Sequence, residues 1–341
     1  MEYSRLGDSG LYVAPIIVGC MSYGSKKWSE WIIEDEEEVF KILKKCYDSG
    51  LRTFDTADVY SNGQSEVLIG KFIKKFNIPR NRIQILTKCY FPLDEDDLDF
   101  NHSDYPLGDI DLINKRGLSR KYILEAVESS VRRLGTYIDV LQIHRLDKNT
   151  PKREIMRSLN DVVEKGYTRY IGASSMKAVE FVELQYIAEM HGWHKFISMQ
   201  SYYSLLNRED ERELIPFCQN NELGKVGLIP WSPIAKGLLA RPFGANSEFN
   251  RTKSNDFGLK AMHLTKEDEI IINRVEELSK KHLVSMAVIS TRWSIQKGCQ
   301  PIIGLNSERR IEDIVQATTI KLTDEEMDYL ENPYKPKPLE W

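Results

Sequence analysis

The feature that most constrains the fold of this chain is a regular alternation between short apolar segments, rich in valine and isoleucine, and longer segments with helical periodicity. The alternation runs from about residue 15 to about residue 318 and is typical of repeated β-α units that build a parallel sheet. The eight predicted strands are residues 15–19, 52–57, 83–88, 138–144, 170–173, 197–200, 226–231 and 301–304. Eight units within 341 residues predict an α/β fold of the (β/α)8, or TIM-barrel, class, as a single domain over residues 1–341, rather than an open sheet.

Shorter sequence patterns predict elements before, within and after the barrel. Residues 3–13 place a glycine-flanked turn between alternating residues, which predicts a hairpin that closes the barrel floor. Residues 323–330 predict a last helix, and residues 332–341 form a proline-rich tail. Within the barrel, Ser119 and Gly135 stand where a capping residue would begin a helix and a glycine would end it.

Two long stretches do not fit a minimal β-α unit: the acidic residues 92–116 and the polar residues 241–262, each of which follows a predicted strand. Loops after barrel strands lie on the face where barrel enzymes place their active sites, so both stretches are candidate lids. An ordinary solvated insertion explains the acidic stretch equally well. The sequence leaves that choice open.

Composition excludes several classes of function. Charged residues make up 29% of the chain and the net charge is −4, so the basic face that nucleic-acid binding requires is missing and a small-molecule partner is expected. The five cysteines are an odd number without a CxxC pair, which argues against a disulfide framework and against a zinc site. No segment approaches the roughly 18 apolar residues that a membrane span needs. We therefore expect a soluble cytoplasmic protein with no bound metal, and the sequence leaves homo-oligomerisation open.

Three of the predicted strands end in ionisable residues. Asp55, Lys88 and His144 stand at the ends of the second, third and fourth strands, and Tyr60 follows in the loop after Asp55. An apolar run that ends in a charge is unusual, because a buried unpaired charge is costly. Each residue taken alone has an ordinary explanation, such as a surface lysine or a structural histidine. Neighbouring strand ends face one another in a barrel, so together these residues predict one shared site.

The chemistry of these four side chains suits carbonyl reduction. A buried lysine beside a carboxylate keeps its charge, and a cation near a phenol lowers the tyrosine pKa from its usual value of about 10. Tyr60 would then serve as a general acid or base near neutral pH, with Lys88 and Asp55 tuning it. A neutral imidazole at His144 would hydrogen-bond a substrate carbonyl and orient it.

The residues around these strand ends resemble the aldo-keto reductase family, whose tetrad of Asp, Tyr, Lys and His matches Asp55, Tyr60, Lys88 and His144. The resemblance covers nearly the whole chain. The family's two signature segments are echoed by residues 50–57 and 137–144, and residues 19–24, 172–175 and 230–233 are similar to its fungal aryl-alcohol-dehydrogenase-like branch. The resemblance implies a barrel enzyme that reduces aldehydes or ketones, with Tyr60 as proton donor.

No G-x-G-x-x-G follows any predicted strand, so a Rossmann dinucleotide site is not supported. The resemblance implies a different kind of cofactor site. In this family an extended nicotinamide cofactor lies across the top of the barrel. An arginine that matches Arg310 contacts the 2′-phosphate, which favours NADPH over NADH. The residues implied to contact the cofactor are Gly19, Cys20, Met21, Asp55, Ser174, Ser175, Gln200, Trp231, Ser232, Pro233, Ile234, Lys236, Gly237, Leu239, Gly304, Ser307, Arg310 and Asp313.

Within that set the resemblance assigns separate parts of the cofactor. Ser174, Ser175 and Gln200 match the positions that hold the carboxamide, and Trp231 matches the aromatic that stacks on the nicotinamide. Residues 232–239 match the loop that wraps the pyrophosphate. On the pattern alone, Trp231 is equally well explained as a core tryptophan.

The opposite end of the implied cofactor site carries both a match and departures. Residues 304–310 lead into a helix whose N-terminus would cradle a phosphate, and Asp313 matches an adenine contact. Alternatively, Arg310 is an ordinary exposed residue of a solvated helix. One residue at each end of the site departs from the family pattern: Ser175, at the carboxamide, and Ile314, at the adenine, each replace a common asparagine, so cofactor affinity is less constrained than cofactor identity.

Aromatic residues near the predicted site indicate the kind of substrate. Trp28, Trp31 and Tyr90 follow predicted strands and would supply flat apolar walls, which favour aryl or long aliphatic aldehydes over sugars. The sequence therefore predicts an NADPH-dependent reductase of aldehydes or ketones. The alternative is a nucleotide-bound redox sensor or regulatory subunit with slow turnover, because the family also includes potassium-channel β subunits.

Overall fold

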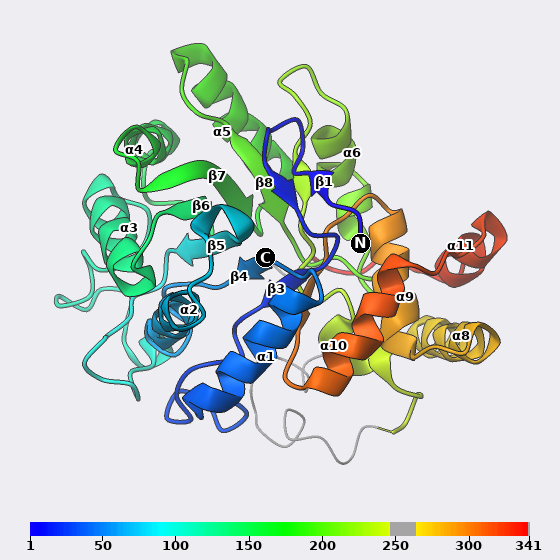
Figure 1. Cartoon of the computed structure of the whole chain (residues 1–341). Coiled ribbons are helices and arrows are strands. Elements are labelled where there is room, and N and C mark those ends of the chain that lie inside the picture. Colours follow the sequence, from blue (N-terminus) through cyan, green and yellow to red (C-terminus); the bar gives the residue numbers. More distant parts are fainter. Residues whose placement is uncertain (246–263, 340–341) are drawn as a thin grey trace.

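The strands form one parallel sheet that closes on itself. The computed structural model of the protein describes residues 1–245 and 264–339. Eight strands run in the order β10-β3-β4-β5-β6-β7-β8-β9, with helices around the outside (Figure 1). The ring closes because the amides of Gln300 and Ile302 donate to the carbonyl oxygens of Leu228 and Pro230, both at 2.9 Å. The predicted (β/α)8 barrel is therefore confirmed.

All eight predicted strands are present, most of them shortened at their ends. Their bounds are β3 Ile17–Gly19, β4 Thr53–Asp55, β5 Gln84–Cys89, β6 Ile138–Ile143, β7 Thr168–Ser174, β8 Phe196–Gln200, β9 Gly227–Leu228 and β10 Ile302–Gly304. The largest difference is β9, which was expected over residues 226–231. Beyond Leu228 the backbone still bonds its neighbour, since the amides of Ile229 and Trp231 donate to the carbonyls of Met199 and Ser201.

The helices begin and end where capping residues predict. The Ser119 side chain accepts a hydrogen bond from the Tyr122 amide at the start of α3, and Gly135 ends α3 with φ of 66°. Thr323 caps the last helix in the same way, through the Glu326 amide. The helices are α1 Glu36–Asp48, α2 Gln64–Lys75, α3 Arg120–Leu134, α4 Lys152–Glu164, α5 Ala178–His191, α6 Leu214–Gln219, α8 Lys266–His282, α9 Met286–Gln296, α10 Glu308–Val315 and α11 Asp324–Glu331.

The N-terminal hairpin, formed by β1 Ser4–Arg5 and β2 Tyr12–Val13, packs against the barrel as predicted. Leu6 and Val13 are fully buried, in one apolar cluster with barrel residues that include Ile17 and Val140. The turn is tied down as well, because the Asp8 carboxylate accepts from the Lys225 amide at 2.7 Å. The hairpin thus closes the end of the barrel opposite the strand ends that carry the ionisable residues.

Gly7 is the position in this hairpin where a side chain cannot be accommodated. Its φ is +61°, and an added Cβ would lie 2.4 Å from the Lys225 carbonyl oxygen and 2.8 Å from the Gly227 nitrogen. Gly7→Ala should therefore destabilise the protein by about 1–3 kcal/mol, measured as a lower urea midpoint. Gly10→Ala is the matched control, since its Cβ would meet only the Tyr170 hydroxyl at 3.7 Å. Equal midpoints for both variants would contradict the prediction.

The acidic stretch 92–116 is fastened to the loop that carries Tyr60. The Asn62 side-chain amide donates to the carbonyl oxygens of Asp97 and Phe100, at 3.2 and 2.9 Å. Its role as a lid remains a prediction. Most of the second stretch, 241–262, lies outside the described residues.

Among the residues that the structure describes, no helix combines the length and apolar character needed to cross a membrane.

Candidate active site

The barrel brings the four predicted residues together at the carboxyl ends of β4, β5 and β6. The Lys88 ammonium lies 2.6 Å from Asp55 Oδ2 and 3.2 Å from the Tyr60 hydroxyl. It also donates to the Thr56 carbonyl oxygen at 2.7 Å. The His144 ring meets the Tyr60 ring edge-on, with centroids 6.0 Å apart. Lysine, carboxylate, phenol and imidazole thus form one contiguous group.

Backbone pairing fixes this geometry. The amides of Thr56 and Asp58 donate to the carbonyls of Leu86 and Lys88, so the loop after β4 stays attached to β5 as it leaves the barrel. The His144 amide donates to the Cys89 carbonyl and holds the histidine at the end of β6. Two of the candidate catalytic residues, Asp55 and Lys88, therefore stand on the sheet itself, and the segments that carry Tyr60 and His144 are attached to it, which is more rigid than a free loop.

Burial sets the charge states of the group. Burial by itself lowers the pKa of Lys88, but the contacts with Asp55 and Tyr60 outweigh it, so the pKa is raised and the ammonium stays charged. Burial raises the pKa of Tyr60 above its usual value, and the opposing effect of Lys88 is smaller. The expectation of a lowered tyrosine pKa is therefore wrong here. Tyr60 is a protonated phenol at neutral pH, which is the form that can donate a proton.

The second oxygen of Asp55 is held by two glutamines. Gln142 and Gln200 each donate from Nε2 to Asp55 Oδ1 at 2.9 Å, and Gln200 also donates to Gln142 Oε1 at 2.8 Å. The sequence analysis placed Gln200 on the cofactor side and missed Gln142. The sequence feature that could have indicated Gln142 was its side-chain amide within the mostly apolar strand β6. This network fixes the orientation of the carboxylate that faces Lys88.

Three residues predicted to meet the nicotinamide end of a cofactor lie side by side. The Trp231 indole N–H donates to Ser175 Oγ at 3.1 Å, and the hydroxyls of Ser174 and Ser175 are 3.3 Å apart. Trp231 is half-buried, so it is not a core tryptophan. Its ring stacks on Tyr202, which the sequence analysis missed, with centroids 4.5 Å apart. A flat indole is thereby held rigid beside two hydroxyls.

The first strand end is more closed than expected. Gly19 pairs with both Asp55 and Gly304, and an added Cβ on Gly19 would meet Ile302 Cγ2 at 2.9 Å. Cys20 is fully buried, and its amide donates to the Asp55 carbonyl oxygen at 2.8 Å. The neighbouring Met21 is partly exposed. Of these residues, Met21 is therefore the one with side-chain surface facing out of the barrel.

The loop after β9 contains a left-handed backbone turn. Ser232, Lys236 and Gly237 have φ angles of 51°, 55° and 100°. The amides of Ala235, Gly237 and Leu239 donate to the carbonyl oxygens of Ser232 and Ile234, so these three N–H groups hold the turn together and are not free to bind an anion. The Lys236 ammonium lies 5.7 Å from the centre of the Tyr202 ring. The residues of this loop named in the sequence analysis, including Pro233, Ile234 and Leu239, form one turn at the barrel top.

The segment after β10 carries Arg310, and Arg241 follows the turn after β9. Ser307 accepts from the Arg310 amide at the start of α10, and Arg310 Nη1 donates to Asn306 Oδ1 at 2.7 Å. Burial lowers the pKa of Arg241, and the charge of Arg310 adds a smaller effect in the same direction. A guanidinium at a helix N-terminus, such as that of Arg310, fits a phosphate group. Asp313 instead accepts from the Ser285 hydroxyl at 2.6 Å.

Aromatic rings line the mouth of the site. The Trp28 ring lies 6.4 Å from the Tyr60 ring and 6.2 Å from the Trp31 ring, centroid to centroid. Phe91, which the sequence analysis missed, lies 5.1 Å from the His144 ring and 4.9 Å from the Tyr90 ring. The predicted aromatic walls are therefore adjacent to the catalytic group.

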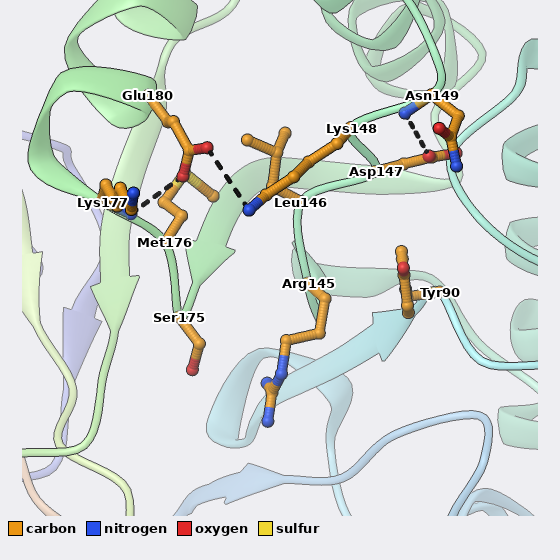
Figure 2. Close-up of a pocket in the computed structure, with 10 residues that line it drawn as sticks. All are labelled: Tyr90, Arg145, Leu146, Asp147, Lys148, Asn149, Ser175, Met176, Lys177 and Glu180. Carbon is orange, nitrogen blue, oxygen red and sulfur yellow. Dashed lines mark hydrogen bonds and ion pairs between the residues drawn. The ribbon is translucent and has the colours of Figure 1, made fainter. Parts of the chain in front are cut away.

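A cavity of about 500 Å³ adjoins these walls (Figure 2). Tyr90 lines it on one side and Ser175 on the other, and Arg145, which the sequence analysis also missed, lies between them. The sequence feature that could have indicated Arg145 as a site residue was its position directly after His144. The cavity is large enough for a small aromatic ligand and reaches the residues beside Tyr60.

Comparison with known proteins identifies the family of the chain. The aldo/keto reductase family model matches residues 15–335. The chain is 56% identical over 337 residues to "Putative aryl-alcohol dehydrogenase AAD16" of Saccharomyces cerevisiae, covering 98% of this chain and 97% of that protein. It is 53% identical over 346 residues to versiconal hemiacetal acetate reductase of Aspergillus parasiticus, covering 99% and 98%. The chain belongs to the aldo-keto reductase family, whose oxidoreductases act on small carbonyl substrates.

Proposed function

We propose that the protein reduces aryl or aliphatic aldehydes and ketones to alcohols with NADPH, and that Tyr60 donates the proton. The observation that carries this proposal is the contact of the Tyr60 hydroxyl with the buried, charged Lys88, at 3.2 Å. A raised tyrosine pKa keeps the phenol protonated until the substrate carbonyl arrives. A small carbonyl compound is the partner, and the cytoplasmic location expected from the cysteine pattern remains part of the proposal.

The residues act in sequence around the carbonyl group. When bound, NADPH supplies the hydride. Tyr60 gives its proton to the carbonyl oxygen, and the Lys88 ammonium stabilises the phenolate that remains. Asp55 keeps Lys88 charged and in place, and His144 orients the carbonyl. The aromatic walls exclude water, which strengthens each of these electrostatic contacts.

The strand ends fit an extended dinucleotide. Trp231 and the hydroxyls of Ser174 and Ser175 would hold the nicotinamide end, and Lys236 of the left-handed turn after β9 would meet the pyrophosphate. Arg310, at the start of α10, would meet a 2′-phosphate, which is the group that distinguishes NADPH from NADH. Gln200 would have to exchange part of its bonding with Asp55 to reach the carboxamide.

Steady-state oxidation of NADPH by the purified protein, with nitrobenzaldehyde as the carbonyl, tests the proposal. Turnover that depends on both reactants supports the reductase. Tight retention of NADPH without turnover over a broad set of aldehydes and ketones would contradict it and would favour the redox sensor. NADH is assayed in parallel, because a phosphate contact predicts a preference for NADPH.

The role of Arg310 predicts a selective loss. Arg310→Ala should raise KM for NADPH about tenfold and leave KM for NADH unchanged, because a charge-assisted contact is worth about 1.5–3 kcal/mol and an exposed one falls at the lower end. Arg309→Ala removes the same charge from the adjacent exposed position and is the matched control. Equal effects of Arg310→Ala on both cofactors would assign the arginine a structural role.

A further inference from the structure

Arg145 is a cation beside the catalytic group for which the proposed reaction has no use. It follows His144 directly, and its Nη1 donates to the His144 carbonyl oxygen at 2.6 Å. The side chain lines the cavity together with Tyr90 and Ser175 (Figure 2). The loop after β6 therefore places a guanidinium where a bound carbonyl compound would extend.

Three of the other charged side chains of this cavity, Asp147, Lys148 and Glu180, already have partners in the protein, and the fourth charged residue, Lys177, is exposed to solvent. Lys148 lies 4.0 Å from Glu180 Oε1, and the Lys177 amide donates to Glu180 Oε2 at 3.1 Å. The carboxylate of Asp147 accepts from the Leu118 amide, the Asn149 amide and the Thr150 hydroxyl. Both acids are therefore engaged with these partners and not with Arg145.

Arg145 differs from these groups because it is largely buried and none of the described residues supplies a counter-ion. Among residues 1–245 and 264–339, no aspartate or glutamate lies within ion-pairing distance of its guanidinium, and its Nε and Nη2 make no hydrogen bond to the protein. Burial lowers the pKa of Arg145, and only the phenols of Tyr60 and Tyr90 oppose this effect. A guanidinium that is largely removed from water without an anion is costly, and a bound anion would offset that cost.

The position of Arg145 separates it from the expected phosphate sites. In the closed ring of eight strands, β6 stands four strands away from β10, on the opposite side of the barrel. The loop after β10 carries Arg310, and the left-handed turn follows the adjacent β9. An anion at Arg145 would therefore belong to the substrate rather than to the phosphates of the cofactor.

We propose that Arg145 binds an anionic substituent of the carbonyl substrate, with its free Nε/Nη2 edge holding a carboxylate in a bidentate manner. The planar fork of a guanidinium matches the two oxygens of a carboxylate. The Tyr90 ring would pack against the body of such a substrate. This inference rests on the proposed reductase function and names its substrate class: aldehydes and ketones that carry a carboxylate.

Two aldehydes of similar shape and different charge test the proposal. Wild type should show a higher kcat/KM for 4-carboxybenzaldehyde than for its methyl ester. Arg145→Gln should lower kcat/KM for the carboxylate about 10- to 100-fold, mainly through KM, and change the ester less than about threefold. Arg145→Lys should retain part of the preference, because a point charge replaces the fork.

Lys148→Gln is the matched control, since it removes a cation from the same cavity that is exposed and already paired. It should leave the preference for the carboxylate intact. Equal losses for acid and ester in Arg145→Gln, or no wild-type preference for the acid, would overturn the proposal. Calorimetric binding of benzoate to wild type and Arg145→Gln decides the same question if neither aldehyde is reduced. Absence of turnover with normal, Arg145-dependent benzoate binding would overturn the reductase but keep the anion site.

Discussion

Tyr60→Phe should lower kcat for NADPH-dependent aldehyde reduction by about 10²- to 10⁴-fold, the range that a positioned general acid contributes. The substitution removes the hydroxyl that lies 3.2 Å from Lys88 and keeps the ring that packs against Trp28 and His144. NADPH binding, measured by quenching of tryptophan fluorescence, should remain within about threefold of wild type because the phenol does not belong to the expected cofactor contacts.

The matched control removes a phenol hydroxyl from the other end of the barrel. Tyr3 donates to the Gly50 carbonyl oxygen at 2.9 Å, close to the N-terminal hairpin, so Tyr3→Phe should keep kcat within about threefold of wild type. Retention of more than a tenth of wild-type kcat by Tyr60→Phe would assign the proton to another donor. A fall in NADPH binding equal to the fall in kcat would instead show that the phenol acts in binding.

The barrel and its four convergent residues could be predicted because both depend on short-range patterns. Eight apolar runs fix the strands, and residues at the ends of adjacent parallel strands must meet. The helix ends followed from single capping residues such as Ser119 and Gly135. Strand lengths were less accurate, since β9 loses regular pairing where its backbone bends toward Trp231.

The electrostatic state of the site could not be predicted in the same way. The sequence indicated that Lys88 lies near Tyr60, and taken alone this contact would lower the tyrosine pKa. The opposing effect of burial depends on how completely the surrounding loops exclude water, which no local pattern encodes. The same limit explains why Gln142 and Arg145 were missed, because their contacts with Asp55 and with the cavity arise only when distant segments pack.

The ion pair between Glu66 and Arg133 was also missed, for a related reason. Glu66 stands in the first turn of α2, where an acid is expected on any solvated helix. In the structure it is fully buried and accepts from Arg133 Nε at 2.6 Å. The same guanidinium packs close to Gly63, where an added Cβ would lie 2.7 Å from Arg133 Cδ. The pair therefore supports the turn that follows Tyr60.

Arg133→Met should destabilise the protein by about 3–5 kcal/mol, because removal of one partner leaves the other charge buried without compensation. The side chains of Arg133 and Glu66 are only 4% and 0% exposed. Arg133 also donates to Glu95 and to Ser130, so Ser130 loses this donor while Glu95 keeps Arg132. Urea unfolding followed by circular dichroism measures the change in midpoint.

The adjacent arginine provides the matched control. Arg132 donates to the same Glu95 at 2.7 Å but is 65% exposed, so Arg132→Met should cost only about 0–1 kcal/mol. The double variant Arg133→Met with Glu66→Gln should recover part of the lost stability, since it leaves no buried charge unpaired. Equal midpoints for the two single variants would show that water reaches Glu66 and that the pair is not buried in solution. A double variant less stable than Arg133→Met would show that the Glu66 charge is compensated by another group.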